Sequence, residues 1–277
     1  MENTILKYLL RDLIKEDILN FRIQICYLIF DIPTFLVLFF LNAGYGKFYN
    51  FNAAPSFFPT ISSRTSWIIQ ESPCVFITLY YLIKLLNQIT FIKFMIILPF
   101  LIHYIHRTLI FPFIIHNSKN SPFDITLMAF TFCVFNSIIQ NRSIFYFSEY
   151  SQNYIFKIQY LIGLIVFIIG MSINIFHDYM MAYKRKEIKE KGKYILPKGY
   201  LWDYISCPNY FGEMTEWFGF AILSGTFSGF IFFISTIANL FPRAIKYHNW
   251  YKNKFKDEFN DKNDIVKNRK AIIPFFI

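Results

Sequence analysis

Apolar runs close to the length of a bilayer span recur along this chain, and they limit its possible folds more than any other feature. They cover roughly residues 22–41, 67–88, 91–112, 122–141, 155–177 and 211–242. A helix that crosses the hydrocarbon core of a bilayer needs about 20 such residues. Only 17% of the 277 residues are charged, whereas a soluble domain carries about 25%. The sequence therefore predicts an all-α integral membrane protein.

The last apolar run is too long for one ordinary span at a rise of about 1.5 Å per residue. Small residues interrupt it at Ser224-Gly225-Thr226 and Ser228-Gly229, and we expect a turn there. The first run follows charged residues and lacks a small-residue cleavage site, so we interpret it as a retained span and not a signal peptide. These runs predict a bundle of about seven transmembrane helices over residues 21–277, preceded by an N-terminal extension at 1–20.

Basic residues are concentrated in two stretches. Residues 184–193 hold six basic and two acidic side chains, and residues 243–270 hold nine basic and four acidic ones. An excess of lysine and arginine near span ends marks the cytoplasmic side. We therefore expect a cytosolic C-terminus and, with seven spans, a lumenal N-terminus. The two basic stretches could be solvated flanks of the spans, a loop and a tail that cap a polyanionic cofactor, or both.

The four cysteines, Cys26, Cys74, Cys133 and Cys207, are scattered and form no CxxC pair. This distribution favours buried thiols over a disulfide framework or a structural zinc site. His103 and His106 lack a third ligand at a metal-binding spacing, so no metal is expected. Membrane lipids are the expected surroundings, and neither a nucleic acid nor an obligate protein partner is predicted.

Polar clusters interrupt the apolar runs, and ionisable residues inside a span are functional candidates by default. They are Glu71 in QESP, His103 to Arg107, Asn174 and Asp178 followed by Arg185, the Asn209–Glu213–Glu216 set, and Arg243 with Tyr251. Helical spacing places Asn209, Glu213 and Glu216 on one face. Taken singly, each cluster could be a packing carboxylate, an interfacial ion pair or a snorkelling arginine. Together they indicate a charged ligand held at the cytoplasmic half of the bundle.

The same residues carry a resemblance to the steroid 5α-reductase family, the 3-oxo-5α-steroid 4-dehydrogenases, and most of all to its plant brassinosteroid-pathway type. The motifs are GYGKF (44–48), WIIQESP (67–73), HYIHRT (103–108), GMSINIFHDYMMAYKRK (170–186), YILPKGYLWDYISCPNYFGEMTEWFGF (194–220), NLFPRAIKYHNWYKNKF (239–255) and RKAIIPF (269–275). They occur in the family's order, and residues 170–277 resemble it most. Ile195, Phe48 and Tyr247 depart from the residues that are usual in the family.

The resemblance implies an enzyme of the endoplasmic reticulum membrane that takes NADPH from the cytosol. It implies reduction of a carbon–carbon double bond conjugated to a carbonyl, most simply the Δ4 bond of a 3-oxo-steroid or a sterol-like lipid. Glu71 and Tyr104 would then meet at the carbonyl oxygen and stabilise the developing enolate. The implied cofactor contacts are Asn174, Asp178, Arg185, Tyr194, Asn209, Arg243 and Tyr251, with Arg107, Glu213 and Tyr45 as further ones.

Two alternatives remain open from the sequence. The same chemistry could act on a polyprenal or a very-long-chain trans-2-enoyl-CoA, because enoyl-CoA reductases share the SCPNY element (206–210). A non-catalytic lipid-binding protein could also keep this fold, although it would not need Glu71, Tyr104, Asn174 and Asp178 together.

Overall fold

The computed structural model describes residues 22, 24–29, 33, 36, 59–115, 118–187, 194–261 and 264–276. The expected extension at 1–20, Tyr45, most of the first expected span and residues 188–193 of the basic stretch lie outside these residues. The helices are α3 (Ser63–Lys84), α4 (Phe91–Ile105), α5 (Phe111–Ile114), α6 (Phe123–Arg142), α7 (Ile158–Glu187), α8 (Pro208–Ser224), α9 (Phe227–Lys254) and α10 (Lys256–Asn260). A short antiparallel pair, β1 (Thr60–Ile61) and β2 (Ser121–Pro122), links the ends of α3 and α6.

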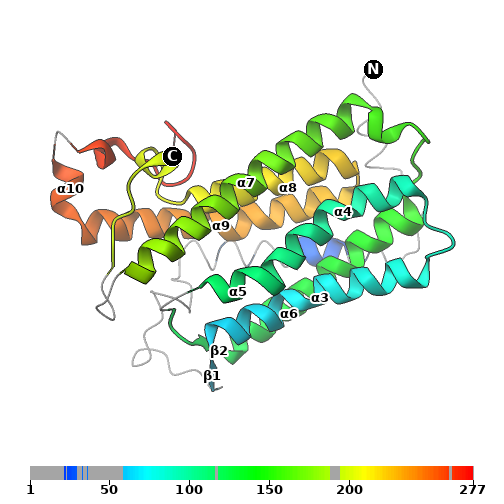
Figure 1. The fold of residues 1–277 in the computed structure, drawn as a ribbon, viewed down its shortest axis with the longest axis horizontal. Coiled ribbons are helices and arrows are strands. Elements are labelled where there is room, and N and C mark those ends of the chain that lie inside the picture. The colour runs from blue at the N-terminus through cyan, green and yellow to red at the C-terminus, as the bar shows by residue number, and fades with distance from the viewer. Residues whose placement is uncertain are drawn as a thin grey trace.

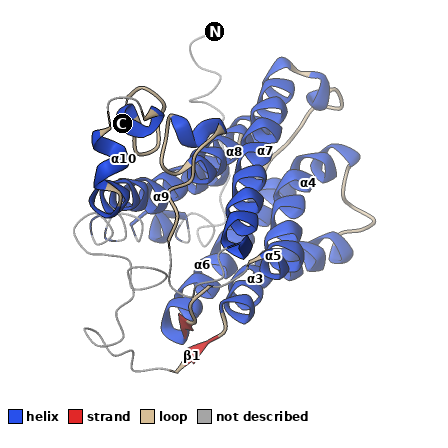
Figure 2. Cartoon of the chain, turned by 60° about the vertical axis from the view of Figure 1, so that its left-hand side comes forward, coloured by secondary structure: helices blue, strands red, loops and turns tan. Residues whose placement is uncertain are grey.

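The helices form two groups that run side by side, α3 to α6 in one and α7 to α9 in the other (Figure 1). Within the described ranges, four continuous helical stretches are long and apolar enough to cross a membrane: Phe91–Ile114, Phe123–Phe147, Ile158–Glu187 and Phe227–Lys254. The almost wholly helical composition is clear in Figure 2. The predicted class, an all-α membrane protein, is therefore confirmed.

The last apolar run divides where the sequence predicts. Gly225 ends α8 in the left-handed conformation, with φ at 61°, which costs glycine little. The Thr226 hydroxyl then accepts a hydrogen bond from the Gly229 backbone N–H at 3.0 Å and caps α9. Both α7 and α9 extend about three turns beyond the apolar runs, because lysine and arginine are good helix formers that end an apolar run without ending a helix.

Four glycines bring the backbones of α7 and α8 into direct contact. Gly163 and Gly170 on α7 face Gly219 and Gly212 on α8. The two glycines of each helix are seven residues apart in sequence, which places them on the same face of that helix. A Cβ atom at Gly170 would lie 2.2 Å from the Glu216 backbone nitrogen. Small residues are what allow membrane helices to approach this closely. The polar residues of α7 and α8 are consequently held opposite one another.

Aromatic packing joins this helix pair to the rest of the bundle. Trp217 of α8 is buried, and its ring lies 4.4 Å from Phe232 on α9, 6.0 Å from Phe100 on α4 and 6.2 Å from Phe167 on α7. Buried aromatic pairs at such distances contribute about 0.5–1.5 kcal/mol each beyond area burial. Trp217 therefore packs four helices, α4, α7, α8 and α9, against one another next to Glu216.

Residues 194–207 and 264–276, called the cap here, pack together at the ends of α7 and α9 that carry the basic residues. The backbone N–H of Ser206 donates to the Lys270 carbonyl at 2.9 Å, and Ile205 and Lys270 form a parallel bridge. The buried Arg269 side chain donates to the Pro197 carbonyl at 2.7 Å. Burial lowers the pKa of Arg269 to about 10, so the guanidinium stays charged at neutral pH.

Replacing Gly170 with alanine tests the close contact of α7 and α8. The added methyl group must push the Glu216 backbone away, and overpacking of this kind costs about 1–3 kcal/mol. We expect a lower midpoint of thermal unfolding in detergent. Ser172→Ala, on the exposed face of the same helix, should leave the midpoint unchanged, and equal midpoints for the two variants would contradict the described contact.

Candidate active site

Arg107 is the cation at the centre of the site. It lies in a π-helical turn, His106–Ile110, that follows α4, and such turns are frequent at functional sites. Its guanidinium is buried and stacks on the rings of Trp67 and Phe111, each with its centroid at 4.4 Å. Burial and stacking together hold the positive charge in one place and aim it at the other helix group.

Asp178 of α7 is the ion-pair partner of Arg107. Nη1 of Arg107 donates to Oδ2 of Asp178 at 3.0 Å, and Nδ2 of Asn209 on α8 donates to Oδ1 at 2.8 Å. Both carboxylate oxygens are therefore paired, as a buried carboxylate requires. Arg185, which the sequence also suggested as an ion-pair partner for Asp178, is exposed about two turns further along α7, and its charge acts on Asp178.

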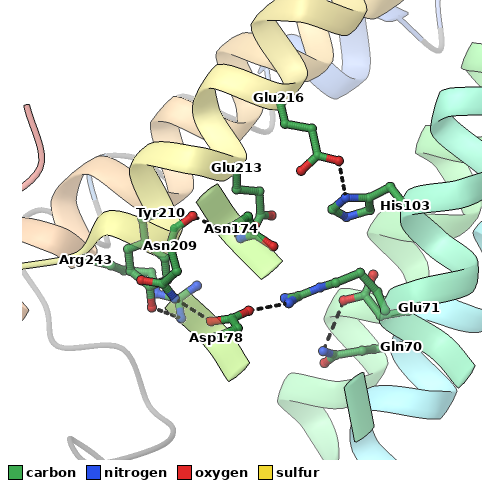
Figure 3. Close-up of polar contacts among 11 residues, drawn as sticks. Gln70, Glu71, His103, Asn174, Asp178, Asn209, Tyr210, Glu213, Glu216 and Arg243 are labelled. Carbon is green, nitrogen blue, oxygen red and sulfur yellow. Dashed lines mark hydrogen bonds and ion pairs between the residues drawn. The ribbon is translucent and has the colours of Figure 1, made fainter. Parts of the chain in front are cut away.

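Asn174 joins the same network one turn before Asp178. Its side-chain amide donates to the Asn209 carbonyl at 3.0 Å and to Oε2 of Glu213 at 3.3 Å. Asn174, Asp178, Asn209 and Glu213, four predicted cofactor residues, thus form one continuous polar wall between α7 and α8 (Figure 3).

His103 and Glu216 form a second buried pair beside this wall. Nδ1 of His103 is hydrogen-bonded to Oε1 of Glu216 at 2.7 Å, and the two side chains are 5% and 0% exposed. Figure 3 shows the other carboxylate oxygen pointing away from the histidine. Within the described part of the chain, that oxygen, Oε2, has no hydrogen-bond partner. A buried acceptor without a donor is unusual in a protein, and this oxygen could accept a hydrogen bond from a ligand's N–H or O–H group.

Glu71 lies across Arg107 from Asp178, on α3. Gln70 donates to its Oε1 at 3.3 Å, and the thiol of Cys133 on α6 approaches its Oε2 at 3.8 Å. Glu71, Glu213, Asp178 and Glu216 all lie near enough to act on the charge of Arg107. One guanidinium therefore faces four carboxyl groups that come from three helices.

Tyr104 is buried on α4, next in sequence to His103. Its hydroxyl oxygen accepts a hydrogen bond from Nδ2 of Asn136 on α6 at 3.2 Å. The amide uses this oxygen as an acceptor, so the phenolic O–H does not point at Asn136, and the Cys74 thiol lies within its reach. Cys74 and Cys133 are close to both Tyr104 and Glu71, so the two predicted catalytic residues share one neighbourhood.

The remaining predicted cofactor residues lie nearer the cap. Arg243 donates to the Tyr210 hydroxyl at 3.1 Å and to Asn239 at 3.2 Å. Tyr194 packs edge-on against Trp250 with centroids 4.9 Å apart, and Tyr251 is buried in the adjoining aromatic cluster. The helical continuation of α9 to Lys254 is what carries Arg243 and Tyr251 toward the cap.

Sequence reasoning did not single out Asn136, Cys133, Gln140 or Trp67 as site neighbours. Asn136 and Gln140 are fully buried polar residues of α6, and Gln140 donates to the Asn136 side chain at 3.2 Å. The sequence did contain a signal for these two residues, since two amides one turn apart inside an apolar span are unusual.

The structure places His103 and His106 in other contacts. His103 pairs with Glu216, and the ring of His106 stacks on that of Tyr179 with centroids 5.9 Å apart. Among the described residues, no group of three possible metal ligands is found.

These donors and acceptors suit one class of ligand. Arginines with planar guanidinium forks bind phosphates, and amide and carboxylate groups pair with carboxamide and hydroxyl groups. The wall supplies the amide and carboxylate groups, Arg107 lies against it through Asp178, and Arg243 lies nearer the cap. The residues present therefore fit a ligand that combines phosphates with amide and hydroxyl groups, such as a dinucleotide.

Known proteins are similar in sequence to this chain over most of its length. A family model described as 3-oxo-5-alpha-steroid 4-dehydrogenase matches residues 119–277. "Steroid 5-alpha-reductase DET2" of Arabidopsis thaliana is 38% identical over 250 residues, which cover 88% of this chain and 91% of the relative. The chain belongs to the 3-oxo-5-alpha-steroid 4-dehydrogenase family.

Two further relatives show how broad the similarity is. "Steroid 5-alpha-reductase DET2" of Gossypium hirsutum is 36% identical over 252 residues, 89% of this chain and 93% of its own. "3-oxo-5-alpha-steroid 4-dehydrogenase 1" of Rattus norvegicus is 36% identical over 225 residues, 78% of this chain and 81% of its own. The resemblance drawn from the sequence motifs is confirmed, and membership of the family makes the chain an oxidoreductase acting on CH–CH groups.

A double-mutant cycle tests the pairing of Arg107 with Asp178. Asp178→Asn leaves the Arg107 charge buried without its partner, and breaking a buried pair in this way costs about 3–5 kcal/mol. Combining it with Arg107→Met should cost less than the sum of the two single changes, because they share one interaction. The midpoint of thermal unfolding measures this.

Asp257→Asn is the matched control, because Asp257 is exposed on α10 and its loss should leave the midpoint unchanged. Strict additivity of Arg107→Met and Asp178→Asn would contradict the described ion pair.

Proposed function

We propose that this protein is a membrane-embedded, NADPH-dependent reductase of the Δ4 double bond of a 3-oxo-steroid or a similar sterol-like enone. The observation that carries the proposal is that Glu71 and Tyr104 lie in one neighbourhood, beside Cys74 and Cys133, across from the polar wall of α7 and α8. The names of the relatives support the steroid substrate. Besides NADPH, the reaction then needs a hydrophobic enone and the surrounding lipids, and no obligate protein partner.

The two catalytic groups act on the substrate's carbonyl oxygen. When a hydride adds to the β-carbon of an enone, negative charge moves onto that oxygen, and fixed donors there lower the barrier. Tyr104 can donate because Asn136 already satisfies its oxygen as an acceptor. Glu71 donates in its protonated form, and Gln70 and Cys133 hold its carboxyl group in place.

The polar wall would hold the cofactor. Asn174, Asp178, Asn209 and Glu213 would bind its amide and hydroxyl groups, and Arg107, Arg185 and Arg243 would balance its phosphates; Tyr194 and Tyr251 would flank it near the cap. When bound, NADPH supplies the hydride. The helix contact at Gly170 and Gly212 keeps the wall rigid, which favours pre-organised binding.

We place the protein in the endoplasmic reticulum membrane, with the cap and the C-terminus in the cytosol and the N-terminus in the lumen. The basic last turns of α7 and α9 support this orientation, because cytoplasmic flanks are enriched in lysine and arginine. Cytosolic NADPH would then reach the wall from the cap side, and the steroid would enter from the membrane.

Removing either donor tests the assigned roles. Glu71→Gln and Tyr104→Phe should each lower kcat by about 10²–10³ or more, because each removes one donor from the developing enolate. NADPH should still bind with nearly unchanged affinity, since neither residue belongs to the wall. Turnover is measured by NADPH oxidation that depends on added steroid, and binding by NADPH fluorescence.

Tyr160→Phe makes the same chemical change at another buried tyrosine, whose hydroxyl donates to the Met95 carbonyl at 3.3 Å, and should leave turnover within a few-fold of the parent. Full activity in Glu71→Gln or Tyr104→Phe would remove that residue from the mechanism.

Substrate choice is tested separately. The purified protein is offered a 3-oxo-Δ4 steroid, a polyprenal and a long-chain enoyl-CoA in parallel, with products identified by mass spectrometry. We expect reduction of the steroid. Reduction of only one of the others would keep the mechanism and reassign the substrate, and no reduction by folded protein would refute the proposed activity.

A further inference from the structure

The outer edge of the cap carries a row of exposed aromatic side chains. Tyr200, Tyr204, Phe275 and Phe276 are 64%, 47%, 77% and 81% exposed. The rings of Tyr204 and Phe275 lie 5.7 Å apart, and the ring of Tyr200 lies 4.9 Å from that of Phe176 on α7, which connects the cap aromatics to the bundle. Large aromatic groups gathered at a surface mark an interaction site.

Backbone strain marks the same row independently. Tyr200 and Phe275 have φ angles of 55° and 69°, and in the described ranges no other residue except glycine has a positive φ. The left-handed conformation is costly for a bulky side chain. Strain of this kind persists where the surroundings require it and concentrates at functional positions. In this chain it turns two aromatic rings outward instead of into the core.

The position of the row points to the bilayer as its partner. Phe176 belongs to an outward stripe on α7 that includes Ile165, Ile168 and Tyr179, all exposed apolar or aromatic side chains. Phe176 follows the start of α7 by about 27 Å at 1.5 Å per residue, close to the thickness of a hydrocarbon core of about 30 Å. Tyr200 packs on it at this depth, so the row begins at the membrane boundary.

Charge agrees with this placement. The last turn of α7 carries Lys184, Arg185 and Lys186. Basic residues beside an aromatic belt suit the headgroup region, where lysine and arginine meet anionic lipids and aromatic rings lie at the interface.

We propose that Tyr200, Tyr204, Phe275 and Phe276 insert into the cytosolic membrane interface and anchor the cap to the lipid surface. The anchor acts on the site through the backbone, since the tail pairs with residues 204–207 immediately before α8 begins. It thus fixes the segment that leads into Asn209. This inference does not depend on the proposed reaction, and its test measures no turnover.

The test is spin-label accessibility in lipid nanodiscs. Cys26 is exposed, whereas Cys74, Cys133 and Cys207 are buried, so Cys26→Ser gives a background with no reactive thiol. Nitroxide labels are attached at Phe276→Cys and, as a second position, at Tyr204→Cys. Lys267→Cys, on the same tail but exposed and charged in the parent, is the matched control. Collision with oxygen reports lipid, and collision with a water-soluble nickel complex reports solvent.

We expect the labels at 276 and 204 to collide several-fold more with oxygen than with nickel, and the label at 267 to show the reverse order. Equal nickel accessibility at all three positions would overturn the anchor. Shielding of 276 and 204 from both reagents would also overturn it, because it would mean that a protein surface covers the row.

Discussion

The contact between α7 and α8 at four glycines is the constraint on which the rest of the structure depends. A side chain at Gly170 or Gly212 would meet backbone atoms of the facing helix within 2.5 Å. Because nothing separates the two backbones, the polar side chains beyond the glycines face each other directly. Asn209 reaches Asp178 at 2.8 Å and Asn174 reaches Glu213 at 3.3 Å for this reason. The polar wall is thus formed by the packing of α7 against α8, and no ligand is needed to bring its side chains together.

Arg107 then joins this wall to the other helix group. A buried guanidinium is tolerated only when paired, and here Asp178 supplies the opposite charge while Trp67 and Phe111 cover the faces of the ion. The π-helical turn that follows α4 places Arg107 at this point. The ion pair therefore connects the helices that carry Glu71 and Tyr104 with the helices proposed to hold the cofactor. Stability and function draw on the same side chains.

Much of the fold follows from local sequence signals. The turn at Gly225, the shared face of Asn209, Glu213 and Glu216, and the all-helical membrane class were predictable because each depends on residues near one another in the chain. The choice of Arg107 as the partner of Asp178, the place of Asn136 beside Tyr104 and the pairing of the tail with residues 204–207 were not. These contacts join residues far apart in sequence, so spacing alone carries no information about them.

The most direct measurement is the position of a transferred deuterium. The protein is given a 3-oxo-Δ4 steroid and NADPH that is deuterated at the transferable position of the nicotinamide. The account predicts a reduced steroid with one deuterium at the β-carbon of the former enone and an intact carbonyl, as read by mass spectrometry and NMR. A product without deuterium, or with deuterium on the carbonyl carbon, would contradict the assignment of Glu71 and Tyr104 to enolate stabilisation.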